Sequence, residues 1–461
     1  MSAGYRFDPT ILREYDIRGV VGETLAAADA DALGRAFGTV VRREGGGRVA
    51  VGYDGRLSSP ELEAALVDGL KRSGVDAVRI GLGPTPMLYF ATHTLAVDGG
   101  VMVTGSHNPP DHNGFKFVLG KASFYGQAIQ ELGRIAADGA YAEGQGGAEE
   151  HGVFDDYVAR LLQDSDPAMA GLTVAWDAGN GAAGAAMAAL VERLPGRHIL
   201  LNEEIDGLFP AHHPDPTVAA NLRQLIETVR AEGCDLGIAF DGDGDRLGAV
   251  DGQGRILWGD QIMLLLARGV LADRPGATII ADVKASQVLF DGIAQAGGRP
   301  LMWKTGHSLI KAKMREEDAP FAGEMSAHLF FADRYYGYDD ALYAALRLLG
   351  EVARSGESLA AFRDGLPAVV NTPELRLACE ESRKWAVVEE VRARLEAAGA
   401  EITAIDGVRV RTEDGWWLLR ASNTQAVLVA RCEAEDEAGL ARLKAALAAQ
   451  LEASGLAPPL D

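Results

Sequence analysis

The stretch LGIAFDGDGDR, residues 236–246, indicates both a fold and a chemistry. Its apolar half is typical of a short buried strand, and the loop that follows carries three aspartates separated only by glycine. Because glycine takes positive φ without strain, the loop can turn until Asp241, Asp243 and Asp245 direct their carboxylates at one point. Carboxylates held that close repel one another unless a cation lies between them, and oxygen-only ligands favour Mg2+. We therefore predict a magnesium site at the end of a strand.

Two other interpretations of this loop are weaker. Asp-Gly pairs also occur in surface hairpin turns, but the i, i+2, i+4 spacing at a strand end favours a metal site. An EF-hand is excluded, because its sixth position would be Arg246 instead of glycine and its twelfth Gly252 instead of glutamate.

The plan around this loop occurs three times along the chain. Each copy opens with a short apolar strand that ends in an acid, at Asp54, Asp177 and Asp282. A helix, a second strand and a third strand follow, and the third strand leads into a polar loop. These three loops comprise residues 104–109, 241–246 and 323–328. Alternating strands and helices predict three similar mixed-sheet α/β/α domains, whose strand ends meet around a central cleft.

Breaks in composition divide the chain into four parts. The first break is the Gly/Glu-rich stretch 142–152, the second follows the hairpin signal at 251–254, and the third lies near Leu366-Pro367. The last part reads as strand, helix, β-meander and helix, which predicts a smaller α+β domain. The predicted domains are residues 1–152, 153–255, 256–367 and 368–461.

Composition excludes several classes of partner. The 461 residues hold 66 acidic and 44 basic side chains, so a net charge of −22 argues against nucleic-acid or anionic-membrane binding. The three cysteines are few and widely spaced, and the start MSAGYRF has no apolar signal core. The longest apolar stretch, 262–272, is too short to span a bilayer. We expect a cytoplasmic protein; the sequence does not specify its oligomeric state.

The loop 104–109, TGSHNP, is a candidate nucleophile loop. Ser106 lies beside His107 and near Lys116 in a segment constrained by glycine and proline, so it is a candidate phosphoryl acceptor. An ordinary hydroxyl-rich turn is the alternative. A Ser-His-Asp hydrolase is disfavoured, because adjacent residues rarely present nucleophile and base in the required geometry.

Two further loops carry groups suited to a sugar phosphate. Glu324 and Ser326 alternate to one side and suit vicinal sugar hydroxyls, while His328 suits acid–base work; a capped helix start is the alternative. A second polar turn, suited to phosphate, comprises Arg420, Ser422, Asn423 and Thr424. Lys284 and His307 add positive or protonatable groups at strand ends.

A glycine motif at 179–184, GNGAAG, supports a different function. It follows a strand, opens an Ala-rich helix and precedes Glu203 by about twenty residues, as in nicotinamide-dependent dehydrogenases. Glycines also serve close packing in any strand–helix turn. The dehydrogenase hypothesis leaves the aspartate, serine and arginine loops without a task, so we rank it below phosphoryl transfer.

Taken together, the four loops in this order and spacing resemble the α-D-phosphohexomutase family, closest to its bacterial phosphomannomutase/phosphoglucomutase branch. The resemblance runs from Glu14-Tyr15-Asp16-Ile17-Arg18-Gly19 to the last domain. It implies reversible phosphoryl transfer between the 1- and 6-positions of glucose and mannose phosphates, through a phosphoserine and a hexose 1,6-bisphosphate. It also implies Mg2+ as cofactor and glucose 1,6-bisphosphate as activator.

The resemblance implies a role for each matched residue. The phosphoserine would be Ser106, with its phosphate oxygen completing a metal site made by Asp241, Asp243 and Asp245. The sugar hydroxyls would bind Glu324 and Ser326. The non-reacting phosphate would bind Arg420, Ser422, Asn423, Thr424, Lys284 and His307. The reaction centre would be lined by Tyr15, Arg18, His107, Lys116, Arg246 and His328. Proton transfer would fall to Lys116 and His328, assisted by Arg18.

Two positions depart from the family pattern. Ala327 stands where related proteins usually have glycine, and Gln425-Ala426 stands where many carry proline. Neither departure removes a functional side chain, so both bear on loop geometry and substrate preference. A phosphoglucosamine mutase and a single-sugar phosphoglucomutase are the alternatives within the family.

Overall fold

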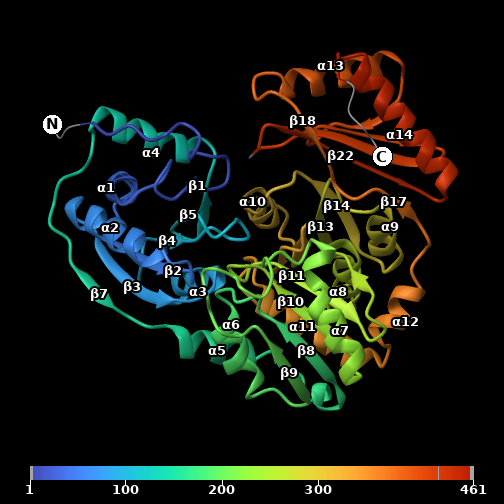
Figure 1. Ribbon diagram of the computed structural model, residues 1–461, viewed down its shortest axis with the longest axis horizontal. Helices are drawn as coiled ribbons and strands as arrows, with labels where there is room; N and C mark the ends of the chain where they lie inside the picture. The colour runs from blue at the N-terminus through green and yellow to red at the C-terminus, as the bar shows by residue number, and fades with distance from the viewer. Residues whose placement is uncertain (1–3, 424, 457–461) are drawn as a thin grey trace.

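The computed structural model describes residues 4–423 and 425–456. Thr424, predicted to belong to the phosphate-binding turn, lies outside the described residues. Four sheets with their helices follow one another along the chain, from the blue N-terminal sheet to the red C-terminal one (Figure 1). The predicted fold class, three mixed-sheet α/β/α domains and a smaller α+β domain, is confirmed.

The first domain is built on a seven-stranded sheet. Its strands are β1 (Ile17–Val20), β2 (Arg48–Tyr53), β3 (Asp76–Leu82), β4 (Gly99–Val103), β5 (His112–Leu119), β6 (Ala122–Phe124) and β7 (Ala148–Glu150). Its helices are α1 (Ala27–Arg43), α2 (Ser59–Arg72), α3 (Thr85–Thr94) and α4 (Gln127–Asp138).

The second domain is built on a five-stranded sheet. Its strands are β8 (Thr173–Asp177), β9 (Arg197–Leu201), β10 (Leu236–Phe240), β11 (Leu247–Asp251) and β12 (Ile256–Leu257). Its helices are α5 (Phe154–Leu162), α6 (Gly184–Val191) and α7 (Arg223–Glu232), with short 3₁₀ turns at Pro167–Gly171 and Ala219–Leu222.

The third and fourth domains complete the chain. The third has strands β13 (Thr278–Asp282), β14 (Arg299–Trp303), β15 (Phe321–Gly323) and β16 (Leu329–Phe331). Its helices are α8 (Gly259–Asp273), α9 (Gln287–Gln295), α10 (His307–Glu317), α11 (Ala341–Ser355) and α12 (Leu359–Asp364).

The fourth domain has strands β17 (Val370–Asn371), β18 (Leu375–Ala378), β19 (Glu401–Thr403), β20 (Val408–Thr412), β21 (Gly415–Ala421) and β22 (Val427–Ala434). Its helices are α13 (Lys384–Ala397) and α14 (Glu437–Glu452).

The first three sheets share one strand order. The central orders are β3-β2-β4-β5, β9-β8-β10-β11 and β14-β13-β15-β16, with the first three strands parallel and the last antiparallel in each. The fourth sheet is antiparallel throughout. The carboxyl ends of β4, β10 and β15 therefore carry the three polar loops, as the sequence predicts.

One apolar core joins the first three domains. Tyr89 and Phe90 of α3, Tyr157 of α5 and Tyr343 of α11 all belong to it, and Phe90 packs on Tyr157 with ring centroids 5.7 Å apart. The fourth domain has a core of its own. The domains that carry the serine, aspartate and sugar loops therefore share one apolar core, whereas the arginine loop belongs to a domain with a separate core.

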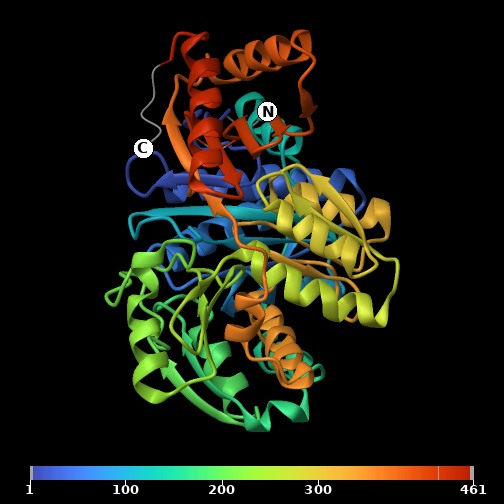
Figure 2. The same cartoon turned by 90° about the vertical axis from the view of Figure 1, so that its right-hand side faces the viewer.

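The fourth domain contacts the third through buried arginines. Arg409 donates to the backbone oxygens of Val283 and Ala285, at 2.7 and 2.8 Å, and its guanidinium lies 3.6 Å from the centre of the Trp416 ring. Both views place the fourth domain at one end of the molecule and the second domain at the other (Figure 1 and Figure 2). Within the described ranges, no helix is both long and apolar enough to cross a bilayer.

Candidate active site

The serine loop presents a buried hydroxyl to the aspartate loop. Ser106 has φ +50°, in the left-handed region, and its Oγ lies 3.3 Å from Asp241 Oδ2 and 3.1 Å from His107 Nδ1. Its backbone N–H donates to Thr104 Oγ1 at 2.8 Å, which fixes the turn. The structure therefore brings Ser106 into contact with the predicted metal site.

Arg56, which was not identified from the sequence, holds this loop through its backbone carbonyls. Its Nη2 donates to the backbone oxygens of Ser106 and Asn108, at 2.7 and 2.6 Å, and its Nη1 donates to two more loop carbonyls. The side chain is buried, and burial lowers its pKa. A Cβ on Gly105 would lie only 2.5 Å from this guanidinium, which explains the glycine. Its only signal in the sequence is its position two residues after the strand-end Asp54.

The three aspartates of 241–245 are fully buried and lie together. Lys116 Nζ donates to Asp243 Oδ2 at 2.7 Å and to Asp245 Oδ2 at 2.6 Å. Burial alone would lower the pKa of Lys116, but these two carboxylates raise it well above its ordinary value. Burial and the two neighbouring carboxylates raise the pKa of Asp241. One lysine thus neutralises only part of the charge.

The free oxygens of the triad fit a metal ion. Among the residues that the structure describes, Asp243 Oδ1 and Asp245 Oδ1 are buried without a hydrogen-bond partner. Buried carboxylate oxygens of this kind are costly unless a cation or a donor satisfies them. The acidic cluster can therefore bind a divalent cation through oxygen ligands.

The glycine motif at 179–184 packs against the back of this loop. Ala182 N donates to Gly242 O at 2.9 Å, and a Cβ on Gly181 would lie 3.0 Å from that same oxygen. A Cβ on Gly184 would lie 2.1 Å from Glu203 O. These glycines serve close backbone contact, which removes the observation that favoured a dehydrogenase.

His212 contacts Asp177 in the turn beside the glycine motif. His212 Nε2 lies 2.9 Å from Asp177 Oδ2 and its Nδ1 lies 3.0 Å from His213 O, so both ring nitrogens face acceptors. Both nitrogens can donate when the ring is protonated, and the bond to Asp177 raises the pKa of His212. The backbone oxygen of Pro214, two residues after His212, accepts from Gly242 N at 3.1 Å. The contact between His212 and Asp177 therefore supports the metal loop.

We expect this ion pair to make stability fall with rising pH. A raised histidine pKa gives stability that is present below its ordinary value of about 6.5 and lost as pH rises through the folded value. Wild type should therefore exceed His212→Gln in free energy of unfolding near pH 6 and lose that advantage in alkali, by urea unfolding. His198→Gln is the control: burial lowers the pKa of His198, so its difference should grow with pH. A pH-independent difference at His212 would contradict the ion pair.

The sugar loop is held by the strand-end aspartate of its own domain. Asp282 Oδ1 accepts from Met325 N at 2.9 Å, and Glu324 Oε1 accepts from Gly306 N at 2.7 Å. Burial raises the pKa of Glu324, and Ser326 beside it is half-buried. Ala327 has φ +68°, a conformation that glycine adopts at lower cost, so the departure from the family pattern falls on a strained position.

His328 joins the sugar loop to the metal loop. Arg246 Nε donates to His328 Nε2 at 3.0 Å, and Leu247 N donates to Ala327 O at 3.2 Å. His307 stacks on His328 with ring centroids 5.5 Å apart. The structure thus brings together the predicted groups of the second and third domains.

The cations predicted to hold a phosphate, from the fourth-domain loop and from the end of β13, are paired with carboxylates. Arg420 Nε donates to Asp406 Oδ2 at 2.9 Å, and Lys284 Nζ donates to Glu374 Oε2 at 2.9 Å. The charge of Lys284 lowers the pKa of Glu374 to about 2. Ser422 Oγ accepts from Gln425 N at 3.2 Å, which closes the turn. Asp406 and Glu374 were not identified from the sequence.

Tyr15 and Arg18 extend the site from the first domain. Tyr15 donates through its hydroxyl to Thr305 O at 2.8 Å and accepts from Asn423, so it touches the third and fourth domains. A Cβ on Gly306 would overlap the Tyr15 ring at 2.5 Å. Arg18 pairs with Asp16 at 2.7 Å and donates to Asn108 Oδ1 at 3.2 Å, beside the serine loop. All described candidates therefore lie in one connected region.

A buried serine beside a cluster of buried carboxylates that can bind a divalent cation, with Lys116 in contact with that cluster, suits phosphoryl transfer. Family models of phosphoglucomutase/phosphomannomutase match all four domains: α/β/α domains I, II and III at residues 9–141, 155–254 and 258–369, and the C-terminal domain at residues 374–450. The chain belongs to this family, the α-D-phosphohexomutases.

Individual relatives are similar to this protein over nearly the whole chain. The phosphomannomutase/phosphoglucomutase of Pseudomonas aeruginosa PAO1 is 45% identical over 444 residues, 96% of each chain. The phosphoglucomutase of Neisseria gonorrhoeae is 43% identical over 451 residues, 96% of this chain and 97% of that one. The crystal structure of a family protein from Burkholderia thailandensis superposes with a TM-score of 0.92 at 45% identity, covering 98% of this chain and 99% of that one.

Proposed function

We propose that this phosphohexomutase interconverts the 1- and 6-phosphates of glucose and mannose through a phosphoserine at Ser106. The observation that carries the proposal is Ser106 Oγ, 3.3 Å from Asp241 in a carboxylate cluster with two unpartnered oxygens. The names of relatives support the substrate class: the Pseudomonas aeruginosa relative is named for both sugars and the Neisseria gonorrhoeae relative for glucose. The alternatives within the family, a glucosamine mutase or a single-sugar phosphoglucomutase, use the same site.

The proposed reaction has two mirror-image phosphoryl transfers. The phosphoryl group of Ser106 passes to the free hydroxyl of a hexose phosphate; that hydroxyl loses its proton and Ser106 Oγ takes one up. Our candidates for moving these protons are Lys116 and His328, with Lys116 suited to donate because the neighbouring carboxylates raise its pKa. The hexose 1,6-bisphosphate then turns end for end and returns its other phosphate to Ser106. Glucose 1,6-bisphosphate would act as activator by phosphorylating Ser106.

The chain's own charges suit this transfer. Phosphoryl transfer needs in-line positioning and neutralised oxygens more than covalent chemistry. The transferred oxygens would be contacted by Arg246 and Arg18, and His107 lies 3.1 Å from Ser106 Oγ. When held by Asp241, Asp243, Asp245 and a phosphoserine oxygen, Mg2+ supplies further positive charge there.

The two ends of the sugar phosphate would be held by separate loops. Glu324 and Ser326 would bind sugar hydroxyls, and the fourth-domain loop, including Ser422, Asn423 and Thr424, would hold the non-reacting phosphate with Lys284 and His307. Tyr15 would border the bound phosphate. Because the arginine loop belongs to a separately packed domain, it can serve either end of the sugar in turn.

Replacing Arg420 by alanine should mainly weaken substrate binding. The guanidinium would contact a phosphate that is charged equally in the ground and transition states, so its loss removes uniform binding. We expect KM for glucose 1-phosphate to rise roughly tenfold to a hundredfold, with kcat changed much less. Arg411→Ala, at an exposed arginine of the same sheet, is the control and should leave KM unchanged. An unchanged KM in Arg420→Ala would contradict the assignment.

The function is tested by comparing three substrates. Purified protein with Mg2+ and trace glucose 1,6-bisphosphate should convert glucose 1-phosphate and mannose 1-phosphate at comparable rates and glucosamine 1-phosphate poorly. Turnover of one sugar alone would narrow the substrate and direct attention to Ala327. No turnover of any of the three would refute the proposal.

Two further expectations accompany this function. We propose domain limits at 1–152, 153–255, 256–367 and 368–461, supported by the separate sheets. We also propose a cytoplasmic location, supported by free, buried Cys234, Cys379 and Cys432. Limited proteolysis and fractionation of cells test the two expectations respectively.

A further inference from the structure

Asp339 is a fully buried carboxylate that none of the four loops contains. It lies just before α11, held by a backbone bridge to Phe330 next to the sugar loop. Its Oδ1 accepts from Lys311 Nζ at 2.8 Å. Its Oδ2 lies 3.1 Å from His328 Nδ1 and 3.7 Å from His307 Nδ1. One carboxylate oxygen therefore faces two imidazoles of the candidate site.

The partner of the other ring nitrogen determines where the proton of His328 lies. Arg246 Nε lies 3.0 Å from His328 Nε2, and an arginine Nε–H can only donate. Nε2 must therefore be the unprotonated, accepting nitrogen, and a neutral His328 carries its proton on Nδ1. That proton faces Asp339. Among the described residues, His328 Nδ1 and Asp339 Oδ2 are both buried and neither has a hydrogen-bond partner, so at a separation of 3.1 Å each can satisfy the other.

A metal ion between these atoms is the competing interpretation. Asp245 Oδ1 lies 3.5 Å from His328 Nδ1, so Asp245, His328 and Asp339 form a cluster of possible ligands. Each of them already contacts a cation, however: Lys116 on Asp245, Arg246 on His328 and Lys311 on Asp339. A dication here would be repelled by three positive charges and by an ion in the aspartate triad. The charges favour a shared proton.

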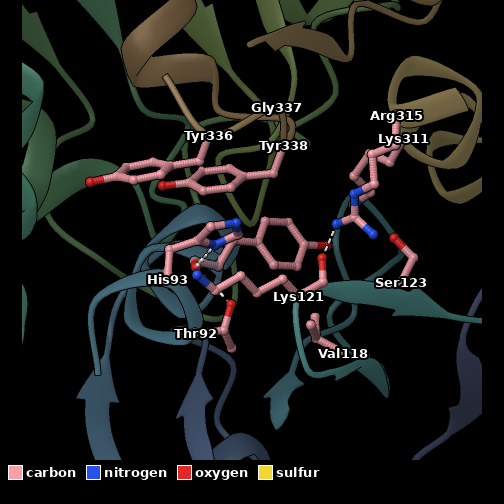
Figure 3. Close-up of a pocket in the computed structure, with 11 residues that line it drawn as sticks. Thr92, His93, Val118, Lys121, Ser123, Lys311, Arg315, Tyr336, Gly337 and Tyr338 are labelled. Atoms are coloured by element: carbon pink, nitrogen blue, oxygen red, sulfur yellow. Dashed lines mark hydrogen bonds between the residues drawn. The ribbon is translucent and has the colours of Figure 1, made fainter. Parts of the chain in front are cut away.

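We propose that Asp339 is the positioning residue of His328, holding its imidazole as the Nδ1–H tautomer so that the Nε2 lone pair accepts from Arg246 Nε and both side chains are fixed in the candidate site. The carboxylate is oriented by Lys311 of α10, which donates to its Oδ1. Lys311 also lines a small cavity of about 20 Å³ between α3, α10 and Tyr338 (Figure 3). The catalytic consequence rests on the proposed function. The tautomer does not, because it follows from donors and acceptors alone.

The variant Asp339→Asn provides a directed test. Lys311 can only donate, so it selects the amide oxygen and turns the amide NH2 towards His328 Nδ1. Nδ1 must then accept, and the proton moves to Nε2, where it opposes Arg246. We expect kcat to fall at least about tenfold with KM nearly unchanged, as for a lost partner that orients a functional imidazole. Asp340→Asn, at the adjacent buried aspartate that caps α11, should not change the tautomer of His328.

A second variant separates positioning from a general structural role. In Asp339→Asn/Lys311→Met the amide is free to turn its oxygen to Nδ1, so kcat should recover several-fold over Asp339→Asn. A double variant no more active than the single one would overturn the proposal.

The tautomer itself is read by long-range 1H–15N NMR on [15N]histidine-labelled protein, with His328→Gln giving the assignment. Wild type should show a protonated Nδ1 at His328 and Asp339→Asn a protonated Nε2. A protonated Nε2 in wild type overturns the proposal, even if no variant folds. Loss of the Nδ1 proton with one equivalent of Zn2+ would show a metal site instead. A Nδ1–H signal in a protein without mutase activity would refute the function and leave the positioning role standing.

Discussion

Replacing Ser106 by alanine should lower kcat by roughly a thousandfold or more while leaving the affinity for glucose 1-phosphate largely intact. The substitution removes only the hydroxyl group, whose hydrogen bonds within the described residues are to His107 and Asp241, so the sugar and phosphate loops keep their geometry. The positive φ of Ser106 costs alanine no more than serine, so the turn should persist. Turnover and isothermal titration with the same substrate measure the two quantities.

The phosphorylated residue can also be identified directly. After exposure to glucose 1,6-bisphosphate, the peptide that contains Ser106 should gain one phosphate in wild type and none in Ser106→Ala, by mass spectrometry. Ser123→Ala, at a half-buried serine of β6, is the control and should keep full turnover. Loss of substrate binding in parallel with turnover, or phosphate on another residue, would contradict the assignment of Ser106.

Sequence periodicity predicted the parts of this fold that repeat. Three apolar strands ending in Asp54, Asp177 and Asp282 indicated three equivalent domains, and the sheets share one strand order. Each aspartate then ties its own strand to a neighbouring segment: Asp54 accepts from Gly105 N, Asp177 from the side-chain amide of Asn202 and Asp282 from Met325 N. The sequence showed the acids but not this shared role, because the hydrogen bonds join segments up to about fifty residues apart.

The chemistry of the loops was readable because it depends on local spacing. Alternating aspartates and glycines in 241–245 sufficed to predict a metal site, and the described residues include two unpartnered carboxylate oxygens there. Arg56, Asp339 and Asp406 were not predicted, because each acts on a partner distant in sequence and none belongs to a motif. The glycine motif at 179–184 misled for the opposite reason: its spacing serves contact with a neighbouring loop as well as phosphate binding.

The second large effect should follow from replacing Lys116 by methionine. Lys116 is the buried cation that contacts Asp243 and Asp245, and methionine preserves its volume without its charge. Removing one partner of a buried ion pair leaves uncompensated charge and typically costs about 3–5 kcal/mol. We expect the variant to unfold at clearly lower temperature than wild type in EDTA, and turnover to fall at least about a hundredfold because a candidate proton-transfer group is lost.

Magnesium should restore stability to Lys116→Met but not activity. A divalent cation in the triad replaces the missing positive charge, so the melting temperature of the variant should rise with Mg2+ more steeply than that of wild type. Catalysis needs a group that can carry a proton, which neither methionine nor the ion's charge provides. Lys71→Met, at an exposed lysine paired with Asp68, is the control and should change neither quantity. If Mg2+ restored turnover together with stability, Lys116 would be a structural counter-ion, and proton transfer would have to rest on His328.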